Sequence, residues 1–172
     1  MSGVAVSRAG ALHLLIGPVG AGKTTYARTL CARTSALFLD LDAWMVRLYG
    51  DDPRPAEGVM AWYVERRDRC RALIWEVASR ALDCGTDVVL EYGLVAALER
   101  EVFYTQVSAE GVGLRISLVD APRDVRRERV AARNRAGAPF TQIVPPAFFE
   151  LASDAWEPPT DSERARWHII DV

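Results

Sequence analysis

The residues with the clearest chemistry lie near the N-terminus, where the segment from Gly17 to Thr24 reads Gly-Pro-Val-Gly-Ala-Gly-Lys-Thr. It fits the pattern GxxxxGK[ST] at every fixed position. Glycines in such a loop let the backbone turn so that successive N–H groups point at phosphate oxygens. The Lys23 ammonium can reach the β- and γ-phosphates of a nucleotide, and the Thr24 hydroxyl can coordinate Mg²⁺. The motif therefore predicts that this segment binds nucleotide phosphates.

A strand and a helix must hold this loop in place. The apolar run 12–16 predicts a buried strand that ends at Gly17, and the apolar spacing over 24–33 predicts a helix. The positive end of that helix dipole then faces the bound anion. The residues predicted to bind the nucleotide here are Gly17, Val19, Gly20, Ala21, Gly22, Lys23, Thr24 and Thr25.

Carboxylates follow two further predicted strands, 36–39 and 88–90. Asp40 and Asp42 come after the first of these strands, and Glu91 directly follows the second. Ligands of parallel sheets bind at the carboxyl ends of the strands, so these side chains are candidates for a metal or substrate site. Asp40 and Asp42 are two residues apart and face the same side of an extended segment. Alternatively, they cap a helix predicted at 44–48.

The remaining pattern alternates strands with helices. Strands are predicted at 114–119 and 167–172, and helices over 59–82, 96–109, 123–134 and 147–153, with a loop at 137–146. Such alternation predicts an α/β fold with a parallel sheet covered by helices on both faces. We find no internal repeat or linker, so residues 1–172 are expected to form a single domain.

Composition narrows the function further. The 172 residues carry a net charge of −2, and 20 of the 21 basic residues are arginine, Lys23 being the exception. A guanine-specific NKxD motif contains a lysine of its own. Since Lys23 already belongs to the glycine-rich loop and is the only lysine, the chain cannot carry that motif, and this excludes an ordinary GTP switch. The balanced charge argues against a nucleic-acid partner. Three cysteines without CxxC spacing indicate a cytoplasmic protein, and no apolar run is long enough to cross a membrane.

The predicted helix 123–134 carries a row of arginines. Arg126, Arg129 and Arg133 are spaced by three and four residues, so they share one helix face. Arginines on such a face can neutralise the charge of a phosphoryl group during its transfer. A solvated charged face is the alternative, because Asp124 and Glu128 offer ordinary ion-pair partners.

Together these motifs resemble small bacterial ATP-binding proteins of the AAA kinase-like group. This group is similar to chloramphenicol phosphotransferase, polynucleotide kinase and zeta toxin, which share an adenylate-kinase-like fold. The resemblance covers about residues 12–163. Besides the glycine-rich loop it rests on Leu41-Asp-Ala-Trp-Met, Glu65-Arg-Arg-Asp-Arg-Cys, Val88-Val-Leu-Glu-Tyr-Gly, Arg133-Asn134 and the stretch from Trp156 to Pro159.

The resemblance implies a P-loop NTPase fold, a three-layer sandwich around a central five-stranded parallel sheet, with a small lid at about 134–147. It assigns the general base and a share of Mg²⁺ binding to Asp42, with Asp40 in reserve. It also places Arg129 and Arg133 over the ATP phosphates as catalytic residues beside Lys23. Arg47, Glu91 and Tyr92 are then candidates to contact the acceptor, and relatives commonly carry aspartate where this chain has Glu91.

These observations predict an ATP- and Mg²⁺-dependent phosphotransferase that moves the γ-phosphate to a hydroxyl of a small molecule, such as an antibiotic, nucleoside or metabolite. One alternative is a kinase similar to polynucleotide kinase or zeta toxin, with a nucleic-acid or sugar-nucleotide acceptor. Another is an ATP-binding regulatory module with little transfer activity. Nothing in the sequence names the acceptor or indicates the oligomeric state.

Overall fold

The computed structural model describes residues 10–137 and 143–172. Within these ranges the strands are β1 (Ala11–Ile16), β2 (Leu37–Asp40), β3 (Val88–Glu91), β4 (Gly113–Leu118) and β5 (Ile170–Asp171). The helices are α1 (Lys23–Thr34), α2 (Leu41–Tyr49), α3 (Val59–Asp83), α4 (Ala97–Ala109), α5 (Arg123–Ala136), α6 (Pro146–Asp154) and α7 (Asp161–Trp167). None of the helices in these two ranges combines the length and the apolar character needed to cross a membrane.

The strands form one parallel sheet in the order β2-β3-β1-β4-β5, which confirms the predicted five-stranded α/β fold. β1 lies in the middle, between β3 and β4. The register sets Leu15 opposite Glu91, and Glu91 opposite Asp40. The carboxyl ends of β1, β2 and β3 therefore meet at one edge of the sheet, where the glycine-rich loop begins.

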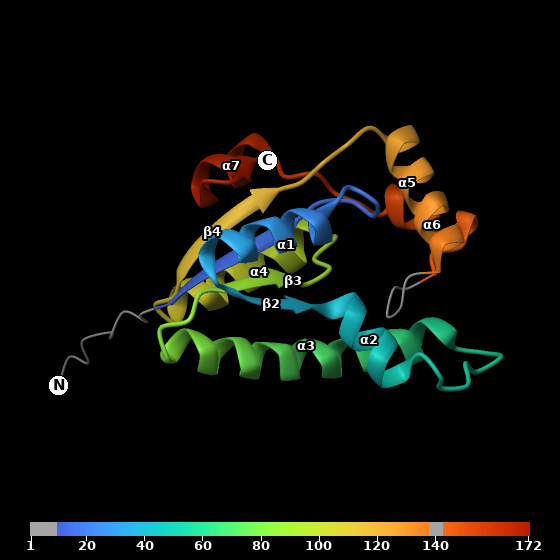
Figure 1. Ribbon diagram of the computed structural model, residues 1–172, viewed down its shortest axis with the longest axis horizontal. Helices are drawn as coiled ribbons and strands as arrows, with labels where there is room; N and C mark the ends of the chain where they lie inside the picture. The colour runs from blue at the N-terminus through green and yellow to red at the C-terminus, as the bar shows by residue number, and fades with distance from the viewer. Residues whose placement is uncertain (1–9, 138–142) are drawn as a thin grey trace.

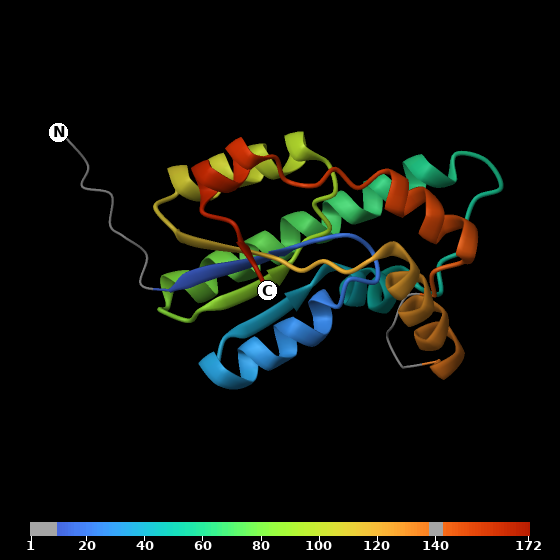
Figure 2. The same cartoon turned by 90° about the horizontal axis from the view of Figure 1, so that it is seen from above.

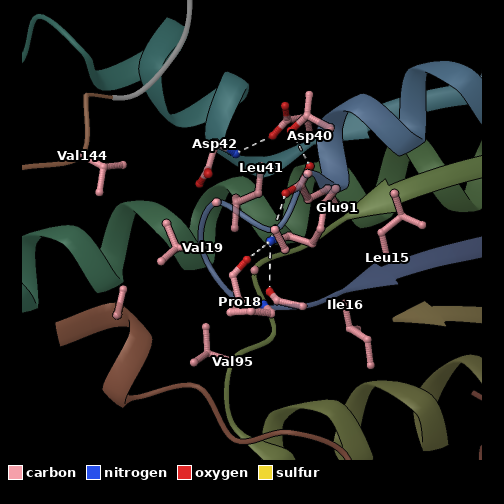
Figure 3. Close-up of a pocket in the computed structure, with 18 of the residues that line it drawn as sticks. Leu15, Ile16, Pro18, Val19, Asp40, Leu41, Asp42, Glu91, Val95 and Val144 are labelled. Carbon is pink, nitrogen blue, oxygen red and sulfur yellow. Dashed lines mark hydrogen bonds and ion pairs between the residues drawn. The ribbon is translucent and has the colours of Figure 1, made fainter. Parts of the chain in front are cut away.

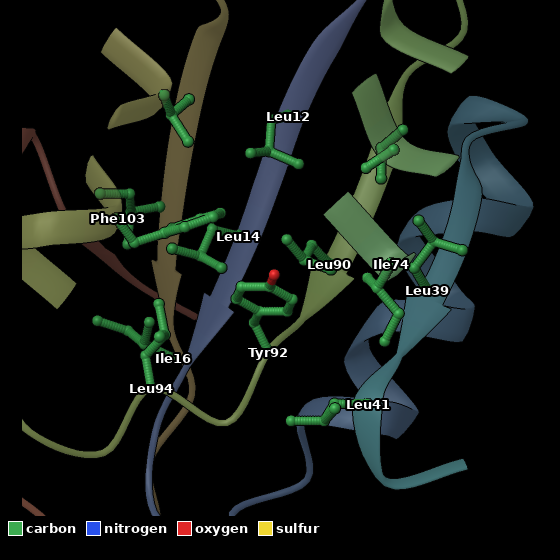
Figure 4. Packing of buried hydrophobic residues seen from close by; sticks show 14 of the residues in the cluster. Leu12, Leu14, Ile16, Leu39, Leu41, Ile74, Leu90, Tyr92, Leu94 and Phe103 are labelled. Atoms are coloured by element: carbon green, nitrogen blue, oxygen red, sulfur yellow. The ribbon is translucent and has the colours of Figure 1, made fainter. Parts of the chain in front are cut away.

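Side chains alternate between the two faces of the sheet, as the period of a strand requires. Leu12, Leu14 and Ile16 of β1 pack with the apolar faces of α3 and α4 (Figure 4). Leu15 faces the other way and packs with Ala27 of α1. Figures 1 and 2 show α1 on one side of the sheet, with α3, α4 and α7 on the other.

Helices α5 and α6 lie beyond the carboxyl ends of the strands (Figure 1). The segment that joins them contains most of the predicted lid, and residues 138–142 of that segment lie outside the described residues. Its two ends are tied together, because the Asn134 side-chain amide donates to Val144 O at 2.7 Å and accepts from Val144 N at 3.2 Å. The predicted loop 137–146 ends at Pro146, the first residue of α6.

Two local predictions were wrong. The expected strand 167–172 is shorter, because Thr160 caps a helix that sequence reading missed, and this helix, α7, runs to Trp167. Asp40 and Asp42 do not share an extended segment, because α2 begins at Leu41, directly after β2. Asp42 thus stands in the first turn of a helix, and its direction differs from that of Asp40.

A buried ion pair fixes the C-terminal segment to α4. The fully buried guanidinium of Arg100 donates to both carboxylate oxygens of Glu163, at 2.7 and 2.8 Å. It also donates to the carbonyl oxygens of Val95 and Glu157. All these donors have partners, which is the condition for burying an arginine at acceptable cost. This cluster holds α7, and therefore β5, against the rest of the sheet.

Candidate functional site

The glycine-rich loop adopts backbone angles that its glycines make possible. Gly17, Gly20 and Gly22 have φ of +145°, +78° and +111°, a region that other residues rarely adopt. A Cβ at Gly17 would lie 2.0 Å from Val119 O, and one at Gly20 would lie 2.8 Å from Arg126 O. The loop therefore packs directly on the end of β4 and on α5, and larger residues at these two positions would displace it.

Lys23 and Thr24 open α1 and share a carboxylate partner. The Lys23 ammonium donates to the carbonyl oxygens of Gly17 and Pro18, both at 3.0 Å. It also lies 3.6 Å from Glu91 Oε1, and the Thr24 hydroxyl donates to Glu91 Oε2 at 2.9 Å (Figure 3). The loop thus holds the lysine curled back over its own backbone, within reach of an anion seated in the loop.

Glu91 is the carboxylate nearest the loop. It ends β3 between Leu15 and Asp40, and its side chain is almost fully buried. The sequence made Glu91 a candidate to position Mg²⁺, water or the acceptor. The structure places its carboxylate against the two loop residues predicted to bind the phosphates and Mg²⁺, Lys23 and Thr24.

Asp40 caps α2. Its carboxylate accepts from Asp42 N at 2.9 Å and from Ala43 N at 3.2 Å. Burial raises the pKa of this carboxyl from 3.8 to about 6, and repulsion by Glu91 and Asp42 adds to the rise. The two backbone hydrogen bonds oppose the rise without cancelling it. These contacts give Asp40 the helix-capping role that the sequence left open for either aspartate.

Asp42 projects from the first turn of α2 into a large cavity (Figure 3). Asp42 is exposed to that cavity rather than packed in the core, and the surrounding protein desolvates its carboxylate. This desolvation raises the pKa of Asp42, and Glu91 raises it further, whereas Lys23 and Arg133 lower it. A carboxylate with a raised pKa next to two cations is suited to accept a proton during phosphoryl transfer.

The arginines of α5 divide into two kinds. Arg126 is buried and donates to Val19 O at 3.0 Å, to Ala121 O at 2.9 Å and to Ser153 Oγ at 3.2 Å. Arg129 donates to Ala21 O at 2.9 Å. Both therefore hold the backbone of the glycine-rich loop. Arg133 lines the cavity, and its buried Nε has no hydrogen-bond partner within the part of the chain that the structure describes, so this side chain is a candidate to bind an anion.

The structure brings most of the predicted site residues to one cavity of 1710 Å³. The residues of the loop from Gly17 to Thr25 line it together with Asp42, Arg47, Glu91, Arg129 and Arg133. Tyr92 is the exception. Its ring packs in the core between Leu90 and Phe103 (Figure 4), and its hydroxyl donates to Arg71 O. Its predicted contact with the acceptor is therefore corrected to a structural role.

The oxygen atoms around Thr24 fit Mg²⁺. This ion binds carboxylate and hydroxyl oxygens and usually keeps several waters and substrate phosphates as ligands. Thr24 and Glu91 supply such oxygens, and a divalent cation would relieve the repulsion by Glu91 and Asp42 that adds to the effect of burial on the pKa of Asp40. The described residues contain no group of three or more His, Cys, Asp or Glu that could enclose a metal by themselves. The nucleotide phosphates would therefore have to complete the coordination.

Sequence reading missed two features of the site. It placed Arg126 among the candidates to neutralise the transferred phosphoryl group, whereas this residue anchors the loop. It also missed the apolar wall that α6 presents to the cavity. The spacing of Phe148, Leu151, Ala152 and Ala155 could have indicated that wall, since these positions share one helix face. Which face of α6 turns to the cavity depends on how α5 and α6 pack together, and that is a tertiary property.

Comparison with known proteins agrees with this geometry. The profile of the AAA domain family matches residues 12–156. The chain belongs to this family. No curated protein sequence matches it.

Solved structures share the fold at low sequence identity. A candidate kinase from Chloroflexus aurantiacus J-10-fl superposes with a TM-score of 0.71 at 19% identity, over 97% of this chain and 86% of its own. Chaetomium thermophilum Kti12 in complex with ADP-AlF3 gives 0.67 at 18% identity, over 94% and 88%. The Mycobacterium tuberculosis APS kinase CysC, bound to AMPPNP and APS, gives 0.53 at 22% identity, over 74% and 75%. The chain thus has a P-loop kinase fold.

Proposed function

We propose that this protein is an ATP-dependent phosphotransferase that moves the γ-phosphoryl group of Mg²⁺·ATP to a hydroxyl of a small molecule. The observation that carries the proposal is one cavity lined by the glycine-rich loop, the Asp42 carboxylate and the Arg133 side chain, whose Nε has no partner among the described residues. A phosphate cradle, a carboxylate for the acceptor hydroxyl and a cation for the transferred group are the three parts that such a reaction needs. The nucleotide-bound relatives of the same fold support this assignment.

In this mechanism the loop amides and Lys23 hold the β- and γ-phosphates. Asp42 accepts the proton of the acceptor hydroxyl while the oxygen of that hydroxyl bonds to the γ-phosphorus. The bond from that phosphorus to the β–γ bridging oxygen breaks, so the products are ADP and a phosphate monoester. Arg133 neutralises charge on the phosphoryl group in transit, and Arg129 keeps the loop in position. Thr24 and Glu91 would hold Mg²⁺, which supplies charge neutralisation at the phosphates.

Asp42→Asn tests the role of the carboxylate. We expect the Kd for Mg²⁺·ATP to change less than about threefold, because the loop is untouched, and kcat to fall about 10²-fold or more, because general-base catalysis is lost. Acceptor-dependent ADP release measures turnover, and calorimetry measures binding.

Asp51→Asn is the matched control. It makes the same change of charge at an exposed position just after α2, and it should retain wild-type turnover. Wild-type turnover in Asp42→Asn would refute the assigned base. ADP release that no hydroxylated compound accelerates above its rate in water would favour an ATP-binding module over a kinase.

A further inference from the structure

Helix α6 presents two different apolar faces. Phe149 on one face is buried against Val130 and Val144 and fixes α6 to α5. The other face carries Phe148 and Leu151, with Ala152 and Ala155 in the same row, and it lines the cavity. The first two of these side chains are 40% and 68% exposed. Apolar side chains that project into a cavity while remaining exposed to solvent indicate a surface that a ligand covers.

Apolar side chains from other segments line the same cavity. Met60 and Tyr63, in the first turns of α3, line the same cavity, and Met60 is 63% exposed. Val95 and Trp156 line it too, and they are neighbours because Glu157 N donates to Val95 O. Figures 1 and 2 both show α6 at the same end of the molecule as the N-terminal turns of α3. Apolar groups from three separate segments therefore line one cavity.

The two arginines that lie near Tyr63, Arg67 and Arg71, are already paired with carboxylates. Arg67 lines the cavity but pairs with Asp68 at 2.9 Å and lies 3.8 Å from Glu99. Glu99 in turn pairs with Arg71 at 3.0 Å. A phosphate or carboxylate placed here would have to compete with these pairs, whereas an uncharged body would leave them intact. This region therefore favours an uncharged ligand.

The cavity also has room for a second ligand. Single small-molecule sites measure about 300–1,000 Å³, and this cavity measures 1710 Å³. The glycine-rich loop lines one part of the cavity, and the nucleotide phosphates would bind there. Asp42 and Tyr63 line the same cavity as the loop, and they lie near each other, because the charge of Asp42 contributes to the raised pKa of the Tyr63 hydroxyl.

We propose that the acceptor is an uncharged alcohol with an apolar body, aromatic or branched aliphatic, whose body packs between α6 and the start of α3 while its hydroxyl reaches Asp42. This inference rests on the proposed function, since it names the substrate class of the same site. The alcohol oxygen bonds to the γ-phosphorus of ATP, its proton passes to Asp42, and ADP leaves.

Two measurements test the proposal separately. The first is ADP release from Mg²⁺·ATP with a panel of uncharged aryl and branched alkyl alcohols, compared with sugars and nucleosides. The best acceptor should come from the first set. Leu151→Ser should raise the KM for that acceptor about tenfold, a loss of about 1.4 kcal/mol of binding. The KM for ATP should change less than twofold. Leu98→Ser, an equally exposed apolar position on α4 outside this cavity, should change neither value.

The second measurement needs no turnover. N-phenyl-1-naphthylamine, a neutral dye that fluoresces in apolar sites, should bind the wild-type protein and Leu98→Ser, but bind Leu151→Ser about tenfold more weakly. A sugar or nucleoside as the best acceptor, or equal dye binding to wild type and Leu151→Ser, would overturn the apolar subsite. Dye binding as expected, with no alcohol phosphorylated, would instead overturn the proposed phosphotransferase function.

Discussion

Replacing Asp40 by asparagine should stabilise the protein in the absence of ligands. In the folded protein burial and two neighbouring carboxylates raise the pKa of Asp40 from 3.8 to about 6. The folded state therefore retains a proton that the unfolded chain has lost, and the contribution of this group to stability falls as the pH rises from about 4 to about 6. Above pH 6 the carboxylate is charged in both states, and its burial in the folded protein then lowers the free energy of unfolding by the full amount.

The size of this cost follows from the shift. The pKa rises by about two units, and each unit corresponds to about 1.4 kcal/mol, so the cost is at most about 3 kcal/mol. Asparagine keeps a side-chain oxygen for the amides of Asp42 and Ala43, and it caps helices about as well as aspartate. We therefore expect Asp40→Asn to raise the free energy of unfolding by about 1–2 kcal/mol at pH 8 and by almost nothing at pH 4.

Urea unfolding followed by tryptophan fluorescence, at pH 4, 6 and 8 and without nucleotide or Mg²⁺, measures the difference. Asp51→Asn controls for the loss of one negative charge at an exposed position near the same helix. The reasoning is wrong if Asp40→Asn destabilises the protein at pH 8, or if its effect is the same at all three pH values. Equal stabilisation by Asp51→Asn would point to net charge as the cause.

Two further substitutions probe the loop. Lys23→Arg should weaken ATP binding about tenfold or more, because a planar guanidinium cannot replace a compact ammonium beside two phosphates. Its circular dichroism spectrum should be unchanged. Isothermal calorimetry measures the affinity, and an unchanged affinity would contradict this prediction. Arg126→Met should also weaken ATP binding about tenfold, because the carbonyl of Val19 loses its donor. The effect is indirect, since it acts through the loop and not through a contact with the nucleotide. Arg127→Met, an exposed arginine on the same helix, is its control, and equal affinities of the two variants would refute the anchoring role.

The sequence was sufficient for the features that depend on local pattern. The spacing of glycines, Lys23 and Thr24 predicted the loop, and the alternation of strands and helices predicted the parallel sheet that the structure has. It was insufficient where a single residue decides the outcome. Thr160 caps α7, so a helix followed by a short strand stands where one last strand was expected. Tyr92 could face either the cavity or the core from the end of β3, and only the packing of Phe103 and Leu90 decides between them.

The two arginine contacts with the glycine-rich loop also determine where its amides point. Each peptide unit is planar and trans, so its C=O and the following N–H point in opposite directions. Arg126 draws the carbonyl of Val19 toward α5, and Arg129 does the same for Ala21. The N–H groups of Gly20 and Gly22 are thereby turned away from α5. The donors for an anion are thus oriented before it arrives, and any shift of α5 is transmitted directly to them.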